Sequence, residues 1–236
     1  MSQTRASFGT ARFCLLLGLL CLPVYLAGSS PLVFWRDSSE FSMLGHNLDI
    51  GHPAGSPTFS MVEKLIDLLP LGSIAYRSTL LTIFFACGAA ALLAWIVLRL
   101  AAVAGLKWPM GEIAALFSVS AFAFSPAWFD WVVAPEVYSA QVLIILAILA
   151  VVLVVRDAEE KGVQDRRWIF VAGFILGLSF GIHMGTILLA PGIAFMLFIP
   201  NRSVLNFRNI LLFGCFVLIG FSVYVYLPVR SSTDIP

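Results

Sequence analysis

The chain has 236 residues, of which 60% are apolar and 11% charged, and its formal net charge at pH 7 is +1. Soluble globular proteins carry about 25% charged residues, and a single soluble core stops growing with chain length. A soluble fold would therefore leave much apolar surface in water, and the composition indicates an integral membrane protein. The near-neutral charge gives no support for nucleic-acid binding.

The apolar runs are long enough for membrane helices, which need about 20 residues. We expect an all-α bundle of about seven membrane segments, at 13–35, 78–98, 110–128, 131–155, 168–182, 185–199 and 209–228. The run 168–199 is divided because a single helix would be about 48 Å long, and because Gly181 and Gly185 flank His183 and can open a turn. The alternative for the first segment is a signal peptide cleaved near Ala27.

Basic residues orient these segments, because cytoplasmic loops of membrane proteins are enriched in Lys and Arg. With the N-terminus in the cytoplasm, ten of the fourteen basic residues lie inside and four outside. The outside set is Arg36, Lys64, Arg77 and Arg230. This bias favours a topology that places the candidate chemical groups on the non-cytoplasmic side.

The first outer loop, residues 36–77, contains a further predicted helix. Ser56 is a suitable N-cap, Pro57 a favoured first helical residue, and Pro70 and Gly72 end the pattern. The expected apolar face carries Phe59, Val62, Ile66 and Leu69, and the expected polar face carries Ser60, Lys64 and Asp67. Such a helix lies in the membrane interface or packs against the bundle, and the sequence leaves both open.

Ionisable residues on the expected outer side are the candidates for chemistry. Asp37 and Glu40 follow the first segment, where a carboxylate can act as a general base toward a hydroxyl. Glu136 precedes a long apolar run and His183 lies between two short ones; charges are costly there, so both are functional candidates. His52, in a rigid turn, either donates to an anion or caps the turn.

Arginines at the outer ends of spans could bind a lipid phosphate through two parallel hydrogen bonds, or anchor the chain in headgroups. Arg36, Arg77 and Arg230 occupy such positions. Two carboxylates could also hold a divalent cation, but their spacing does not establish one. No Cys/His metal spacing occurs, so no metal ligand and no certain cofactor are assigned.

Six short strings together resemble one known family. They are D-S-S-E at 37–40, G-H-P-A-G-S-P at 51–57, I-A-Y-R at 74–77, A-P-E-V-Y-S at 134–139, G-L-S-F-G-I-H at 177–183 and Y-L-P-V-R at 226–230. In this order they resemble a bacterial multi-spanning membrane family formerly of unknown function, whose animal relative is a transmembrane protein O-mannosyltransferase. Ser39, Ala54 and Ser56 depart from the family's glycine, proline and tyrosine.

The resemblance implies a GT-C glycosyltransferase of one domain over residues 1–236, in a bacterial inner membrane with a periplasmic active site. It implies an inverting transfer of mannose or another hexose from a polyprenyl-phosphate donor to a protein or glycan acceptor. Asp37 and Glu40 are the expected catalytic carboxylates. The residues expected to bind substrate are His52, Glu136, Tyr138, His183, Arg77 and Arg230. The chain is short for this class, which leaves open a fragment or a compact version.

The alternative function is a non-catalytic transporter or flippase-like protein, because carboxylates and histidines also build ion relays in membranes. A transporter needs ionisable groups near the midplane, within reach of both sides. Here they gather at one face, which favours an enzyme.

The topology can be tested with single cysteines in a background without the native ones. An impermeant thiol reagent should label Ser232→Cys from outside and Ser203→Cys only after permeabilisation, because the basic-residue bias places them on opposite sides. Labelling of Ser203→Cys in intact cells would place residue 203 outside. The run 168–199 would then be a single span rather than two segments, and the last span would run in the opposite direction.

Overall fold

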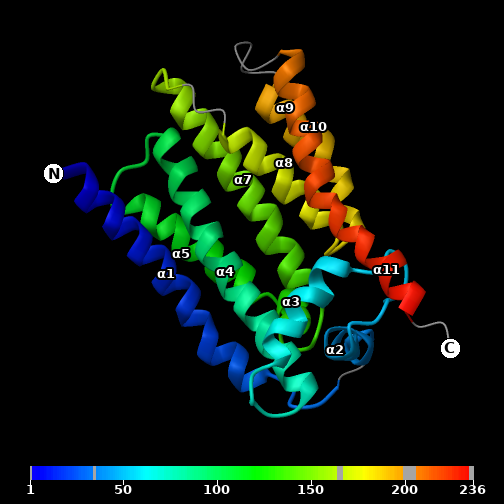
Figure 1. Cartoon of the computed structure of the whole chain (residues 1–236). Coiled ribbons are helices and arrows are strands. Elements are labelled where there is room, and N and C mark those ends of the chain that lie inside the picture. Colours follow the sequence, from blue (N-terminus) through cyan, green and yellow to red (C-terminus); the bar gives the residue numbers. More distant parts are fainter. Residues whose placement is uncertain (1, 34–35, 164–166, 199–205, 234–236) are drawn as a thin grey trace. The chain divides into compact units, whose positions relative to one another are not determined.

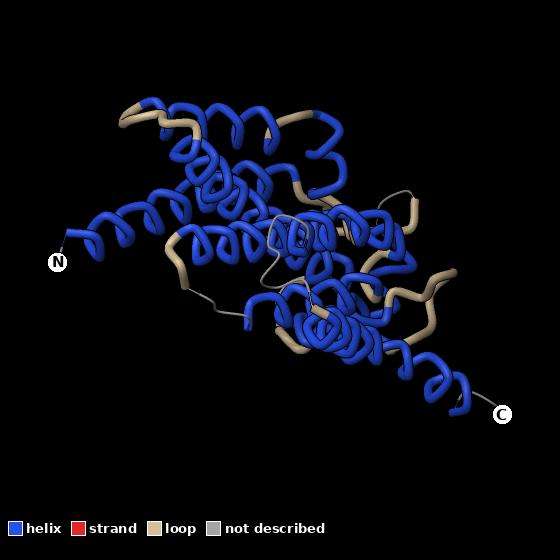
Figure 2. The backbone as a smooth tube through the Cα atoms, turned by 90° about the horizontal axis from the view of Figure 1, so that it is seen from above, coloured by secondary structure: helices blue, strands red, loops and turns tan. Residues whose placement is uncertain are grey.

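The structure is a computed structural model that describes residues 2–33, 36–163, 167–198 and 206–233. These residues form helices and connecting loops, with no β-strand among them (Figures 1 and 2). The chain divides into two compact units, which are described separately. Unit 1 comprises Met1–Ser42 and Ile66–Leu146, and unit 2 comprises Met43–Leu65 and Ala147–Pro236.

The helices of each unit follow in chain order. Unit 1 contains α1 (Ser2–Gly28), α4 (Ile74–Val103), α5 (Met110–Ala123), α6 (Pro126–Val132) and the starts of α2 (Ser38–Asn47) and α7 (Tyr138–Glu160). Unit 2 contains most of α3 (Pro57–Asp67), then α8 (Arg167–Phe180), the 3-10 helix η1 (Met184–Leu189), α9 (Ala190–Phe198), α10 (Phe207–Phe221), the 3-10 helix η2 (Ser222–Val225) and α11 (Tyr226–Thr233).

Four helices in the described part of the chain are long and apolar enough to cross a membrane: Gly9–Gly28, Ile74–Val103, Tyr138–Glu160 and Phe207–Thr233. A fifth span results if α5 and α6, which meet at 66°, form one broken span. Arg167–Phe180 and Met184–Phe198 are shorter apolar helices. The all-helical membrane architecture is therefore confirmed, while the total of seven membrane segments stays a prediction.

Several predicted boundaries were wrong, and prolines explain them. The segment expected at 13–35 is helical only to Gly28, where the Ser29 hydroxyl turns back and donates to the Leu26 carbonyl at 2.8 Å, two residues before Pro31. The segment expected at 110–128 breaks because Ser125 precedes Pro126 and adopts an extended conformation, with φ −65° and ψ 137°. The segment expected at 131–155 contains the end of α6 at Val132 and becomes helical again only at Tyr138, beyond Pro135.

The core of unit 1 joins α1 to α4 and to the bend between α5 and α6. At Gly18 a Cβ would lie 2.5 Å from the Cys87 carbonyl oxygen, so the two backbones need a glycine there. Near the other end of α1, the Tyr25 hydroxyl donates to the Ala123 carbonyl at 2.9 Å and accepts from the Trp128 indole at 3.1 Å. These buried bonds satisfy polar groups within the bend, where water is excluded.

The core of unit 2 is built on close contact between α8 and α10, which lie side by side (Figure 1). A Cβ on Gly173 would lie 2.9 Å from the Phe213 carbonyl oxygen, and one on Gly177 would collide with the Val217 carbonyl oxygen. On α10, a Cβ on Gly220 would in turn collide with the Phe174 carbonyl oxygen of α8. The G-x-x-x-G spacing on α8 therefore brings the two backbones together, as small residues do between membrane helices.

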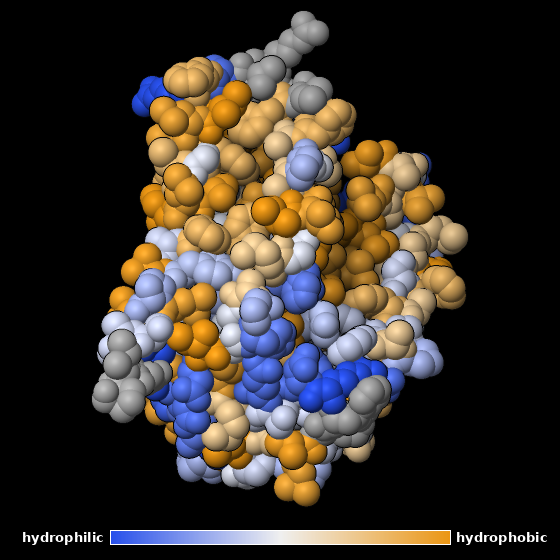
Figure 3. All heavy atoms as spheres, turned by 90° about the vertical axis from the view of Figure 1, so that its right-hand side faces the viewer, coloured by the Kyte–Doolittle hydropathy of each residue, from blue (hydrophilic) through white to orange (hydrophobic). Residues whose placement is uncertain are grey.

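The outward side of α10 is apolar and suits lipid. Phe207, Leu211 and Leu218 are well exposed on it, and Figure 3 shows a largely hydrophobic face of the molecule with hydrophilic residues gathered toward one end. Hydrocarbon is a better solvent than water for such a surface, which agrees with a membrane location.

Gly177→Ala should destabilise the protein by about 1–3 kcal/mol, because the added methyl group meets backbone that cannot rotate away. Gly214→Ala on α10 is the matched control, since nothing lies within 4 Å of its added Cβ. The control should be neutral or slightly stabilising because alanine favours helices. Thermal unfolding in detergent measures both changes, and equal melting temperatures for the two variants would contradict the close-contact interpretation.

Candidate functional site

In unit 1, Asp37 lies immediately before α2 and its carbonyl accepts the first helical hydrogen bond, from the Phe41 amide at 2.9 Å. Arg36 beside it has a φ of +72°, which is uncommon for a residue other than glycine. Both side chains are exposed, and Glu40, in the first turn of α2, is half-buried. Unusual backbone of this kind is concentrated at functional sites, so this turn is a reasonable place to look for one.

Trp131, in the last turn of α6, organises the side chains around this turn. The Arg36 guanidinium carbon lies 4.0 Å from the centroid of the Trp131 ring, which is cation–π geometry. The Tyr138 ring meets the same indole edge-on, with centroids 4.3 Å apart. The indole thus links the turn before α2 to the start of α7, two segments about 100 residues apart.

Tyr138 lies within electrostatic range of two of the predicted carboxylates. Its hydroxyl interacts electrostatically with Glu136, Asp37 and Arg36. Glu136 is 2% exposed, and its backbone N–H donates to the Thr82 hydroxyl of α4 at 3.5 Å. The structure therefore brings together three residues predicted from the sequence, Asp37, Glu136 and Tyr138, with Arg36 as the nearby cation.

Arg77 has a different setting within unit 1. Its Nε and Nη2 donate to one Asp67 carboxylate oxygen at 3.1 and 2.8 Å, and its Nη1 donates to the Gly72 carbonyl at 3.1 Å. These bonds close the turn between α3 and α4. Arg77 therefore serves the fold at this turn, and its predicted contact with substrate stays a prediction.

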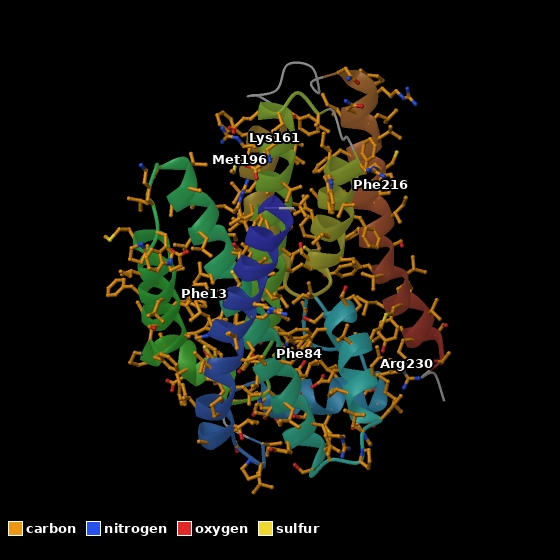
Figure 4. The ribbon with its side chains drawn as sticks, turned by 90° about the vertical axis from the view of Figure 1, so that its left-hand side faces the viewer. Phe13, Phe84, Lys161, Met196, Phe216 and Arg230 are labelled. Carbon is orange, nitrogen blue, oxygen red and sulfur yellow. The ribbon has the colours of Figure 1, made fainter. Side chains whose placement is uncertain are left out.

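In unit 2, the loop between α2 and α3 is held by α11. Arg230, labelled on α11 in Figure 4, donates from Nε to the Leu48 carbonyl at 2.9 Å and lies 3.7 Å from the Asp49 carboxylate. The Tyr226 hydroxyl also donates to the Leu48 carbonyl. Leu48 has a φ of +56°, a conformation that such contacts must maintain.

The other end of this loop is bonded to the end of α8. The Ser56 hydroxyl donates to the Ile182 carbonyl at 2.9 Å, the Thr58 amide to the Gly181 carbonyl at 2.8 Å and the Thr58 hydroxyl to the Leu178 carbonyl at 3.0 Å. His52 lies in the loop between these attachments and is exposed. The same loop therefore connects the predicted residues His52, His183 and Arg230 within unit 2.

His183 lies in the break between α8 and η1, where the sequence predicted a break. Its Nδ1 accepts a hydrogen bond from the Gly185 amide at 3.1 Å and so caps η1. In a neutral imidazole an accepting Nδ1 leaves the proton on Nε2, which is then a donor. His183 is half-buried, so one ring nitrogen serves the fold while the other has donor character.

The α3 helix begins at Pro57 as predicted, and Phe59 of its predicted apolar face is buried. The prediction was wrong at Ser60, which was placed on the polar face but is buried together with Glu63, and at Leu69, which lies beyond the helix and is 42% exposed. The reason lies in Gly45 of α2, where the absence of a side chain makes room for the Glu63 methylene groups. The contacts of Thr58 with α8 tie α3 into unit 2, and a location in the membrane interface stays a prediction.

No group of three or more His, Cys, Asp or Glu residues that could hold a metal ion occurs among the residues that the structure describes. Asp37, Glu136 and Arg36 do not form such a donor set, because an arginine near two carboxylates takes the place of a cation. The divalent cation considered from the sequence therefore stays a hypothesis.

Trp131 was not predicted from the sequence. It lies in F-D-W-V-V, where an aromatic residue in an apolar run is indistinguishable from a core or lipid-facing residue. Arg36 is one of three arginines that the sequence treats as equivalent. Its position directly before Asp37 is the signal that could have singled it out.

The fold and the cluster define an all-helical integral membrane protein with carboxylates and an arginine gathered at helix ends. A family model described as the protein O-mannosyl-transferase TMEM260 N-terminal domain matches residues 37–206. Protein O-mannosyl-transferase TMEM260 of Mus musculus is 33% identical over 203 residues, which are 83% of this chain and 27% of the mouse protein. No solved structure gives a significant match.

The chain therefore belongs to the family of the TMEM260 N-terminal domain, and the relation expected from the six strings is confirmed. The family match begins at Asp37 itself and includes Glu136, Tyr138 and His183, while Arg230 lies beyond it. The chain spans only 27% of the length of the mouse relative.

Arg230→Ala should loosen the loop between α2 and α3, because the Leu48 carbonyl loses one of its donors and Asp49 its ion pair. Amide hydrogen exchange, measured by mass spectrometry, should become faster over residues 48–56, since local opening there becomes less costly. Arg208→Ala, which removes an exposed arginine of α10, is the control. If exchange over residues 48–56 is unchanged in Arg230→Ala, then other contacts hold this loop.

Proposed function

We propose that the chain transfers a hexose, mannose in the first instance, from a polyprenyl-phosphate donor to a hydroxyl of a protein or glycan acceptor. The observation that carries the proposal is the placement of Arg36, directly before Asp37, on the Trp131 indole, with Tyr138 at the edge of the same indole. The name of the mouse relative, a protein O-mannosyl-transferase, supports the class of reaction. The proposed location is a bacterial inner membrane, with the N-terminus cytoplasmic and the site on the exoplasmic side.

In the proposed reaction, the acceptor oxygen attacks the anomeric carbon opposite the phosphate. A carbon–oxygen bond forms to the acceptor while the bond between the anomeric carbon and the phosphate oxygen breaks, and the configuration inverts. The acceptor proton passes to the Asp37 carboxylate, and polyprenyl phosphate leaves with the bonding electrons. Asp37 suits the role of base because its side chain is exposed and held at the start of a helix.

Arg36 supports the departure of the phosphate. Its guanidinium lies on Trp131 beside Asp37, and a positive charge close to the developing phosphate charge lowers the barrier. The face of the indole orients the guanidinium next to the proposed base.

Glu136 and Glu40 are proposed to position substrates. Glu136 is buried, and a carboxylate in such surroundings makes strong hydrogen bonds to sugar hydroxyls. Glu40 lies one helical turn after Asp37 and is half-buried, which suits contact with the acceptor. In unit 2, we propose that His52, His183 and Arg230 bind donor or acceptor through the loop that connects them.

The position of the carboxylates weighs against the transporter alternative. Asp37 precedes α2 and Glu136 precedes α7, so both lie at the ends of helices in unit 1. A proton or ion relay across the membrane needs ionisable groups along the middle of the spans.

Asp37→Asn should lower kcat by about 10²–10⁴-fold, because the amide keeps the size of the side chain but cannot accept the acceptor proton. The assay uses the purified full chain with polyprenyl-phosphate mannose and a mixture of peptide and glycan acceptors, with products detected by mass spectrometry. Asp130→Asn is the matched control, since Asp130 is an exposed carboxylate next to Trp131. The control should retain full activity.

Two results would contradict this assignment. Near-normal turnover in Asp37→Asn together with loss of activity in Glu136→Gln would make Glu136 the base. Absence of turnover by the unmodified chain with every polyprenyl-phosphate hexose tried would remove the transferase proposal itself.

A further inference from the structure

A cavity of about 580 Å³ lies in unit 1, far from Asp37 along α1. It is bounded by the N-terminal part of α1, the C-terminal part of α4 and the start of α5. The helical stretch Gly9–Gly28 separates it from the turn at Asp37 by about 30 Å. Its volume is within the range of small-molecule sites, about 300–1,000 Å³. The proposed transferase reaction makes no use of this end of the unit.

The wall of the cavity combines apolar side chains with two opposite charges. Phe13, labelled on α1 in Figure 4, contributes to the apolar part with Leu98, Leu106 and Trp108. Among the described residues that line it, Arg99 and Glu112 are the ionisable ones. Both are half-buried and both belong to the lining of the cavity.

The cavity lies near the end of a membrane-spanning helix, beside residue types that are common in the headgroup region of a bilayer. Arg99 lies in the last turns of α4, a helix otherwise apolar enough to cross the membrane, and Glu112 in the first turn of α5. Trp108, 82% exposed, lies between them in the sequence, and tryptophan is enriched at the level of the headgroups. This placement holds whichever side of the membrane this end occupies.

We infer that this cavity binds the headgroup of a zwitterionic aminophospholipid of the ethanolamine type. Arg99 pairs with the lipid phosphate, Glu112 accepts hydrogen bonds from the primary ammonium, and an acyl chain follows the apolar wall beside Phe13 and Leu98. The wall thus offers an opposite charge to each of the two charges of the headgroup. A glycerol headgroup offers Glu112 neutral hydroxyls in place of an ammonium, and a choline headgroup has no N–H to donate.

Native mass spectrometry of the full chain tests the inference, with dioleoyl lipids that carry ethanolamine, choline or glycerol headgroups. The unmodified protein should bind the ethanolamine lipid about tenfold or more tightly than the other two, the effect expected of one charge-assisted hydrogen bond. Glu112→Gln should remove this preference without weakening the glycerol lipid. Arg99→Gln should weaken all three lipids.

Two further variants separate binding from folding. Arg12→Gln removes an exposed charge of α1 outside the cavity lining and should leave all three affinities unchanged. Ala102→Leu fills part of the cavity without altering charge and should weaken the ethanolamine lipid, so it replaces Glu112→Gln if that variant unfolds. Equal binding of ethanolamine and choline lipids, tighter binding of the glycerol lipid, a preference that survives Glu112→Gln, or an unchanged affinity for the ethanolamine lipid in Ala102→Leu would overturn the inference.

Discussion

The contact between Trp131 and its two neighbours is the interaction on which the candidate site of unit 1 depends. The indole carries Arg36 on its face and Tyr138 at its edge, and Tyr138 in turn interacts with Asp37 and Glu136. Trp131 is held at the end of α6, whose position is fixed by the Tyr25–Trp128 hydrogen bond in the bend after α5. A buried polar bond in the core thus sets the geometry of charged groups at the surface.

In unit 2, hydrogen bonds to main-chain carbonyls hold the loop between α2 and α3 in place. Leu48 is held by donors from α11, and the carbonyls at the end of α8 are bonded by Ser56 and Thr58. The bonds run to main-chain carbonyls, so the side chains of Leu48 and Ile182 take no part in them, whereas a side chain at Gly181 would collide with the Thr58 hydroxyl.

Much of the fold could be predicted from the sequence, because lipid demands long apolar runs and glycine or proline marks their interruptions. The break at His183 and the helix beginning at Pro57 are of this kind. The boundaries near Pro126 and Pro135 were missed because the apolar pattern continues across them, and hydropathy then outweighs the proline signal. Asp37, Glu136 and Tyr138 were found through motifs, whereas the partnership of Arg77 with Asp67 depends on tertiary contact across a turn.

The hydrogen bonds at the end of α8 have a consequence for how the chain is assembled. Carbonyls at Gly181 and Ile182 would be costly in hydrocarbon without donors, and their hydrogen bonds come from Thr58 and Ser56 rather than from α8. The donors at Ser56 and Thr58 leave the ribosome about 120 residues earlier than α8. Their loop is therefore already present when α8 enters the membrane, and this short helix can complete its insertion by docking onto a segment made before it.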